Sequence, residues 1–486
     1  MIKFPARLAF ALFLASVPVQ ADVVSAWNET LLQAVRTAST NPPRASRIMA
    51  MMHLSVYDSV NGIAPTHRPY LNHPPAPVGA SKEAAACAAA RVVLENVYAE
   101  NATVLGQIAA SYTTTLATVP DGPAKSEGVA WGEARGMAML ALRTGDGSDG
   151  IVPYSPNPIP GLWRPTLPGF APGLLPQWGT MVPFAMARGD MFRPQPPPDL
   201  SGAAYALEVN LVKSVGGTTS VMRTADESEI AQFWADGGGT ETPPGHWLHL
   251  GQDVAEAQGL TMEERARMFA LVSLAVADAA IVAWDAKYAY DYWRPITAIR
   301  EAETDGNDLT EPDPTWVPFV VSPPFPEYTS GHSTFSRSSA TVLAAYFGTD
   351  SIPFTTRSDA LPGVTRSYPG FSAAADEAGI SRIFGGIHFP SANIAGQASA
   401  YGLGTLVFNR FLTPLNATEF TLARVAPDGF AIEANVSIGT TYRVQASSDL
   451  ENWELLATIS AGSPTISFVD TNAPAGKRYY KLVVVP

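Results

Sequence analysis

The sequence predicts a mainly α-helical protein: a helical bundle over residues 22–412, followed by a small β-sandwich domain over residues 418–486. Two patterns indicate this division. Apolar residues recur at helical spacing through most of the first part of the chain. Beyond residue 413 the pattern changes to short alternating runs between Gly, Pro, Asp and Asn turns, which is typical of antiparallel strands.

The chain begins with the pattern of a secretory signal. Lys3 and Arg7 precede an apolar run, and residues 19–21 (VQA) offer the small-residue pattern of a cleavage site. We therefore expect residues 1–21 to be a signal peptide and the protein to be secreted or periplasmic. A short buried helix is the alternative interpretation.

Several packed helices are predicted from about 22 to 145, with turn-rich joints near 41–43 and 69–77. The stretch 153–198 contains 13 prolines, which is too many for a helix. Its aromatic residues favour burial, so we predict an ordered segment that wraps over the helical core. These aromatic residues are Trp163, Phe170, Trp178 and Phe184.

Further helices are predicted near 201–215 and 226–235, and a long one from Thr261, where TMEE fits a capping box. We expect this helix to run to Pro295. Steps of three and four residues would then place four side chains on one face, with an acid between two cations. The alternative is a solvated pair of opposite charges. The four residues are Trp284, Lys287, Asp291 and Arg294.

The C-terminal part begins with a predicted linker at 413–417 and contains five or more alternating runs. The string from Tyr442 to Trp453 resembles fibronectin-like modules of secreted bacterial proteins. It carries no catalytic cluster, so we expect a role in attachment, spacing or solubility.

Composition narrows the class of protein. A chain of 486 residues with 46% hydrophobic and 15% charged residues has the balance of a folded protein. The formal net charge is −13, and removal of Lys3 and Arg7 makes it −15, so a nucleic-acid partner is not expected. Cys87 is the only cysteine, which rules out an intramolecular disulfide.

Membrane association through a spanning helix is not expected either. After the signal, the most apolar stretch, 265–284, is interrupted by Arg265, Arg267 and Asp278. The sequence leaves open whether the protein forms a homo-oligomer.

Three segments carry residues for binding an oxyanion. They read Lys287-x6-Arg294-Pro295, Thr329-Ser330-Gly331-His332 and Ser381-Arg382-x5-His388. Three cations, a hydroxyl, a glycine amide and two histidines can replace the hydration shell of a phosphate-like anion. This combination points to an enzyme.

The three segments resemble the signature shared by vanadium-dependent haloperoxidases and the type 2 phosphatidic-acid/acid phosphatase superfamily, K-x6-RP, PSGH and SR-x5-H. The first and third match in full, and the second has Thr329 for the usual proline. Residues 325–328 (FPEY) look like the soluble, secreted bacterial branch. The resemblance implies a haloperoxidase-like helical fold, with vanadate as the cofactor, or no cofactor in a phosphatase.

The resemblance also implies roles. His388 would be the axial residue, a metal ligand in a peroxidase or the phosphorylated nucleophile in a phosphatase. His332 would act as acid or base for peroxide or a leaving alcohol. The residues that would hold the oxygens of vanadate or phosphate are Lys287, Arg294, Ser330, Gly331 and Arg382.

Three supporting positions follow from the same resemblance. Trp284 and Phe325 match an apolar pair on the halide side of some haloperoxidases, although core aromatics would look the same. Asp236 corresponds to an acid that braces the third-motif arginine. The family often has an aspartate four residues after the axial histidine, but Ala392 stands here. We expect His388 to be less basic as a result, and the chemistry to be slowed.

The remaining histidines are not expected to be functional. His53 lies on an apolar helix, and the others are predicted in loops without metal-ligand spacing, so zinc is not implied. They are His67, His73, His246 and His249.

Three functions stay open from the sequence. The first is a secreted vanadate-dependent haloperoxidase that uses hydrogen peroxide and a halide. The second is a secreted acid phosphatase that acts on a phosphomonoester through a phosphohistidine. The third is an inactive binding or adhesion protein that works through the β-sandwich.

Overall fold

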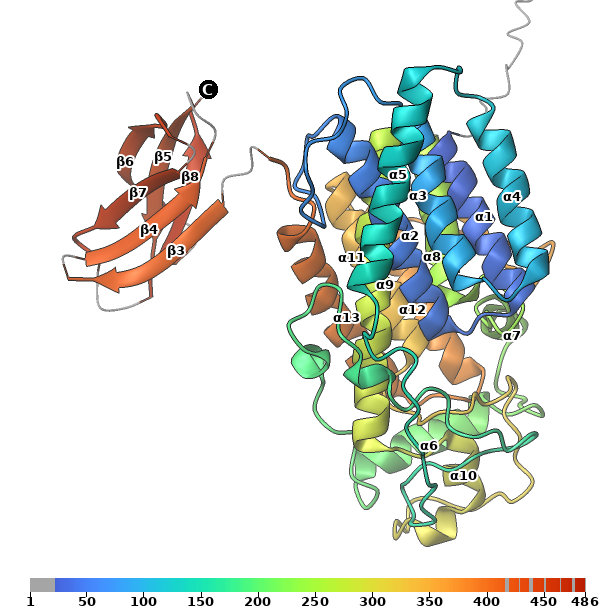
Figure 1. Ribbon diagram of the computed structural model, residues 1–486. Helices are drawn as coiled ribbons and strands as arrows, with labels where there is room; N and C mark the ends of the chain where they lie inside the picture. Colours follow the sequence, from blue (N-terminus) through green and yellow to red (C-terminus); the bar gives the residue numbers. More distant parts are fainter. Residues whose placement is uncertain are drawn as a thin grey trace, which may run out of the picture.

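The computed structural model describes residues 22–415, 419–427, 429–436, 440–449, 452–463, 465–473 and 477–485. Its described parts are a helical body and a set of antiparallel strands in the C-terminal part (Figure 1). The predicted signal peptide, 1–21, and the end of the predicted linker, 416–417, lie outside the described residues.

Five helices open the helical body, as the apolar periodicity predicted. They begin where polar side chains cap them: Asn41 accepts from the amide of Arg44, and Ser81 from that of Ala84. Glycine allows the third and fifth to pack closely, because a Cβ on Gly132 would overlap the carbonyl of Ala85. The helices are α1 (Val23–Ala38), α2 (Pro42–Ile63), α3 (Lys82–Val97), α4 (Ala102–Leu116) and α5 (Pro123–Leu142).

The proline-rich stretch 153–198 is an ordered segment, as predicted, with only the short 3-10 turns η1 (Trp178–Thr180) and η2 (Gly189–Phe192). Trp163 and Trp178 are fully buried. The prediction of burial was wrong for Phe170, which is 60% exposed at a left-handed turn where its backbone turns away from the core.

The next helices are α6 (Ala203–Val215), α7 (Ala225–Phe233) and α8 (Thr242–Ala257). The prediction that His246 and His249 lie in loops was wrong, since both are buried on α8. Pro243 and Pro244 occupy its first turn, where a missing N–H costs little, and they start the helix.

The long helix α9 (Met262–Tyr290) runs through the helical body and packs against α2 and α11 (Figure 1). Its predicted capping box at Thr261 and Glu264 is confirmed. By length and composition it could cross a membrane despite its charges, but 94% of its most apolar window is buried in the protein. It is therefore the core helix of the body.

The body is completed by α10 (Pro295–Arg300), η3 (Ala302–Thr304), α11 (Gly331–Phe347), α12 (Phe371–Phe384) and α13 (Pro390–Arg410). A hairpin that the sequence did not indicate, β1 (Phe354–Arg357) with β2 (Thr365–Tyr368), joins α11 to α12. One large apolar cluster extends from α1 to α13 around α9.

The C-terminal strands form two antiparallel sheets, in the orders β3-β4-β7 and β6-β5-β8. Apolar residues from both sheets, including Ala434, Tyr442 and Ile466, share one cluster, as in a β-sandwich. A fibronectin-like topology stays a prediction. The strands are β3 (Glu419–Ala426), β4 (Gly429–Asn435), β5 (Thr441–Ser447), β6 (Glu454–Ser460), β7 (Thr465–Asp470) and β8 (Tyr479–Val484).

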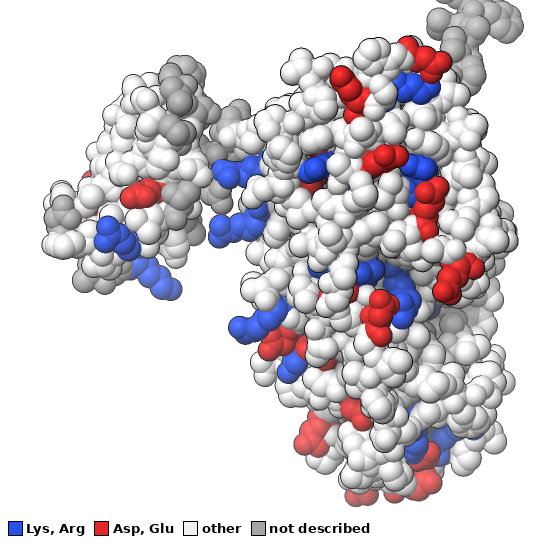
Figure 2. Space-filling view, viewed as in Figure 1, with Lys and Arg blue, Asp and Glu red and all other residues white. Residues whose placement is uncertain are grey.

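Surface charges are dispersed on the face of the molecule in Figure 2, where lysines and arginines lie among aspartates and glutamates. The cations of the three motifs are not part of that surface. Lys287, Arg294 and Arg382 are at most 1% exposed.

Candidate functional site

Lys287 lies in the last turn of α9 and is fully buried. Its Nζ donates to the carbonyl oxygens of Pro326 and Glu327, both at 3.0 Å, and of Thr329 at 2.5 Å. Burial, and then the charge of Arg294, lower the pKa of Lys287 well below its usual value. The side chain thus ties the segment before the second motif to α9, and a direct bond to an anion stays a prediction.

The prediction that Asp291 lies between the two cations on one helix was wrong. The helix ends at Tyr290, and Asp291 adopts a left-handed conformation as its C-cap. Pro295 disfavours helix at the residue before it, and the chain turns between the two. The carboxylate of Asp291 instead accepts from the Tyr154 hydroxyl at 2.6 Å.

Arg294 reaches the site from the start of α10, where its backbone is extended. Its Nε donates to the carbonyl of Phe325 at 2.9 Å and its Nη1 to that of Ile387 at 2.8 Å. Its Nη2 is buried and has no hydrogen-bond partner within the described chain. Burial lowers the pKa of Arg294 to about 9. This guanidinium is held in place with one donor free.

The second motif starts α11. Ser330 is the N-cap, and its Oγ accepts from the amide of Ser333. Gly331 and His332 line the cavity there. The motif therefore lies at a helix N-terminus.

Arg382 lies in the last turn of α12 and donates to Ser381 Oγ at 3.0 Å and to the Ala231 carbonyl at 2.7 Å. Beyond the helix, Gly386 adopts a left-handed conformation against Gly216, whose carbonyl a Cβ would overlap. The chain therefore bends at Gly386, and this bend carries His388 off α12.

His388 is oriented by a carboxylate. Its Nδ1 lies 2.8 Å from Glu327 Oε1, and its Nε2 lies 3.2 Å from Arg294 Nη1. Because an arginine only donates, Nε2 is the acceptor and Nδ1 carries the proton that Glu327 accepts. The lone pair on Nε2 is the one that a metal or a phosphorus atom would use.

Glu327 was missed by the sequence analysis. The expectation that Ala392 leaves His388 without an acidic partner was wrong. Glu327, which precedes His388 in the chain, takes the place of the aspartate that often follows it in the family. Glu327 is fully buried, and burial raises its pKa to about 8, against the charges of Arg294 and Lys287. The acid in FPEY, directly before the second motif, was the available signal.

His332 faces His388 across the site. Burial, then Arg382, lower its pKa well below the usual value, so the ring is neutral. Its Nε2 is buried without a partner among the described residues. A neutral imidazole with a free nitrogen can accept a proton from a bound reactant.

Gly331, His332, Arg382 and His388 line a cavity of about 420 Å³, and Lys287, Arg294, Ser330 and Glu327 lie behind its lining. Trp284 and Phe325 line it, with ring centroids 4.9 Å apart, and Phe325 covers Lys287 and Arg294 at 4.8 and 4.9 Å. The predicted apolar pair therefore lies beside the cations, where it shields them from water.

Asp236 also lines the cavity. Its carboxylate lies 3.3 Å from His246 Nδ1, and its charge acts on Arg382 through space. The predicted brace to Arg382 is thus not a direct ion pair in this structure, and Asp236 is held by a histidine on α8.

The site fits a tetrahedral oxyanion. Within the described chain, Arg294 Nη2 and His332 Nε2 are buried polar atoms without a hydrogen-bond partner, and Gly331 at the start of α11 lines the cavity. Three buried cations outnumber the carboxylates near them, Glu327 and Asp236, so the cluster needs an anion to balance it. Vanadate and phosphate both meet that need.

The fold and this pocket define the class of protein. The family model of the VCPO second helical-bundle domain matches residues 267–417, which contain all three motifs. The solved structure of the first bacterial vanadium-dependent iodoperoxidase is similar over 81% of this chain and 97% of its own, with a TM-score of 0.71 and 26% identity. A bacterial vanadium-dependent chloroperoxidase shares the fold, with a TM-score of 0.61 and 16% identity over 76% of this chain and 92% of its own.

Among curated proteins, the vanadium chloroperoxidase of Curvularia inaequalis is 27% identical over 228 residues. The match covers 40% of this chain and only 36% of that relative. The family model, this match and the shared structure together support a relationship between the chain and the vanadium haloperoxidase superfamily.

Proposed function

We propose that this protein is an exported, vanadate-dependent haloperoxidase that oxidises a halide with hydrogen peroxide. The observation that carries the proposal is the buried Glu327–His388 pair, whose unprotonated Nε2 lies among three cations and accepts from Arg294. Vanadate, when bound, would supply the Lewis acidity that activates peroxide. The similarity to a solved vanadium-dependent iodoperoxidase adds support for a halide as the substrate.

Different residues of this chain would bind vanadate, transfer protons and contact the halide. Arg294, Arg382 and the α11 amides would hold the oxygens of vanadate, and His388 Nε2 would bond the metal. Glu327 would keep the proton on Nδ1, and His332 would take the proton of peroxide. Trp284 and Phe325 would form the wall where a halide loses its water.

The same donors would stabilise phosphoryl transfer, with His388 as the nucleophile, and an acid phosphatase is therefore the second candidate. Glu327 favours this chemistry as well, since an oriented imidazole is a better nucleophile. The apolar wall next to the cations favours the haloperoxidase.

One experiment separates the two. Bromide- and iodide-dependent halogenation of a dye with hydrogen peroxide is measured before and after incubation with orthovanadate, with hydrolysis of a phosphomonoester beside it. We expect halogenation that depends on vanadate. Hydrolysis that vanadate inhibits would make the protein a phosphatase, and silence in both assays would favour a binding protein.

Export is proposed from the N-terminal pattern alone, Lys3 and Arg7 before an apolar run. Expression of the full chain in a bacterium, followed by fractionation and N-terminal sequencing, tests it. A mature protein that starts near Asp22 outside the cytoplasm is expected, and an uncut cytoplasmic chain would refute export.

A further inference from the structure

The cavity, which includes the oxyanion site, is larger than vanadate and the small reactants together need. It measures about 420 Å³. Hydrogen peroxide and a halide ion are each comparable to one or two water molecules, and a water occupies about 30 Å³ in the liquid. The cavity is instead in the range of sites for organic molecules, about 300–1,000 Å³.

The wall of this cavity is apolar and held in shape. The indole Nε1 of Trp284 donates to the carbonyl of Leu174 at 3.0 Å, and the amide of Leu174 donates to that of Pro324 at 2.8 Å. The ring of Trp284 and the proline segment are thereby fixed relative to each other. Apolar residues of the wall are Leu174, Trp284, Val320, Pro323, Phe325 and Ile387.

The charges at the base of the cavity select among organic molecules. Arg382 lies there beside His332 and His388. Within the described chain, the carboxylate that lines the cavity is Asp236, and it is engaged by His246. An organic cation would therefore meet Arg382 with no free carboxylate to offset it, whereas a neutral ring suits the apolar wall.

We propose that this cavity binds a neutral, electron-rich aromatic molecule and that the protein halogenates it in place. The inference rests on the proposed haloperoxidase function. Halide, hydrogen peroxide and one proton give hypohalous acid and water, with a two-electron oxidation of the halide and reduction of the peroxide. The aromatic carbon then gains the halogen, loses its proton, and a second water is released.

Gly238 offers a way to narrow the mouth of the cavity. It lines the cavity, a Cβ there would meet nothing within 4 Å, and its φ is not in the left-handed region. Gly238 is exposed at the edge of the cavity, so Gly238→Leu adds apolar volume at its mouth and leaves every motif residue unchanged. Gly238→Ala is the matched control, because it also replaces the glycine but adds far less volume.

The first measurement is a competition for the halogen. p-Phenylphenol and p-phenolsulfonate are mixed with vanadate-loaded protein, iodide and hydrogen peroxide, and the ratio of their products is compared with the ratio that reagent hypoiodous acid gives. We expect the wild-type ratio to favour p-phenylphenol about tenfold more than the reagent does, because its second ring is buried.

In Gly238→Leu this preference should fall to the reagent ratio, and in Gly238→Ala it should change by less than about twofold. Oxidation of iodide to triiodide without an acceptor should stay within about twofold in both variants. A wild-type ratio equal to that of the reagent would overturn the proposal, because it would mean that a freely diffusing oxidant does the halogenation.

The second measurement separates this inference from the proposed function. p-Phenylphenol is titrated calorimetrically into wild type and Gly238→Leu without peroxide. Binding to wild type that Gly238→Leu weakens at least about tenfold supports the site even if no halide is oxidised. No binding to wild type, or equal binding to both, refutes the site even if halide oxidation is strong.

Discussion

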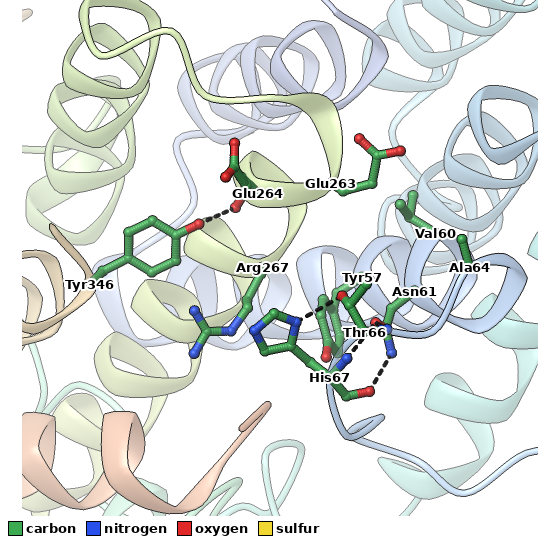
Figure 3. A pocket seen from close by; sticks show the side chains of 10 residues that line it. All are labelled: Tyr57, Val60, Asn61, Ala64, Thr66, His67, Glu263, Glu264, Arg267 and Tyr346. Carbon is green, nitrogen blue, oxygen red and sulfur yellow. Dashed lines mark hydrogen bonds between the residues drawn. The ribbon is translucent and has the colours of Figure 1, made fainter. Parts of the chain in front are cut away.

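The two ends of helix α9 each carry a cation beside a cavity, and only one end has the features of a catalytic site. At the C-terminal end, Lys287 is fully buried among Arg294, Glu327 and His388. At the N-terminal end, Arg267 lines a hollow of about 310 Å³ with His67, Glu263, Glu264 and Tyr346 (Figure 3).

The polar groups of that hollow are used for structure. Arg267 Nε donates to the carbonyl of Leu412 at 2.8 Å, and the Tyr346 hydroxyl to that of Glu264 at 2.9 Å. Glu263 pairs with Lys82 at 2.6 Å. These contacts hold the end of α13 and the first turn of α9 in place.

The comparison teaches that charge alone does not define the site. The hollow contains both cations and carboxylates, and Arg267 is only partly buried. In the oxyanion pocket the cations outnumber the carboxylates and have lost their water, so the cluster needs an anion that the protein does not supply. Burial with an unbalanced charge is the physical signal of function here.

The largest effect is expected at His388. His388→Ala removes the only proposed bond to the metal or phosphorus, so halide oxidation or hydrolysis should fall by at least about 10³-fold. His67→Ala, at the other end of α9, is the matched control and should keep wild-type activity. Steady-state kinetics with circular dichroism checks both, and wild-type turnover in His388→Ala would refute the site.

A smaller loss is expected at Arg382. Arg382→Lys keeps the charge but cannot reproduce a guanidinium that donates to Ser381 and the Ala231 carbonyl while facing an anion. Halide oxidation should fall about 10²-fold. Arg267→Lys makes the same exchange at the other end and should change the rate less than about twofold. An equal loss of activity in both variants would contradict the assignment of the catalytic site to the C-terminal end of α9.

A residue in the middle of α9, Asp278, should make the stability of the protein depend on pH. Asp278 is fully buried, accepts from the amides of Phe184, Ala185 and Met186, and burial raises its pKa to about 6 from 3.8. A raised pKa in an acid means that the folded state binds the proton more tightly. The stability from this group is therefore complete below pH of about 4 and is lost as the pH rises through about 6.

The loss amounts to about 3 kcal/mol in the free energy of unfolding. Denaturant unfolding of wild type and Asp278→Asn, followed by circular dichroism between pH 4 and pH 7, measures it. The variant should be less stable at low pH and should lack this part of the pH slope. An identical slope in both proteins would show that Asp278 does not titrate in this range.

The next effect is expected at Glu327. Glu327→Gln replaces the carboxyl group that accepts from His388 Nδ1 with an amide that can also donate, and the loss of such a partner costs about 10- to 100-fold in metal affinity or activity. Vanadate affinity, measured by reactivation of the vanadate-free protein, should weaken accordingly. Glu327→Asp should recover part of the loss, and unchanged affinity in Glu327→Gln would refute the orienting role.

The smallest effect is expected at Arg267. Arg267→Gln removes the bond to the Leu412 carbonyl and should cost about 1 kcal/mol in stability. Halide oxidation should stay within about twofold of wild type. Thermal unfolding and kinetics test both, and a large loss of activity would assign a function to the hollow that its paired groups do not indicate.

Much of the helical body could be predicted from the sequence, because caps and periodicity are local. The start of α9 at Thr261 and Glu264 and the start of α11 at Ser330 depend on residues within one turn. The end of α9 was misplaced, since the three- and four-residue spacing continues beyond Tyr290 while the chain turns before Pro295. Periodicity does not reveal where a helix stops.

The sequence by itself determined the chemical inventory of this protein: three cations, two histidines and a serine-glycine pair in motif order, and strands at the C-terminal end. Only the tertiary structure decided which carboxylate meets His388. Glu327 stands 61 residues away, and its contact depends on how the segment held by Lys287 passes the kink at Gly386. Burial, which strips the cations of water and leaves their charge unbalanced, is likewise a property of packing between distant segments.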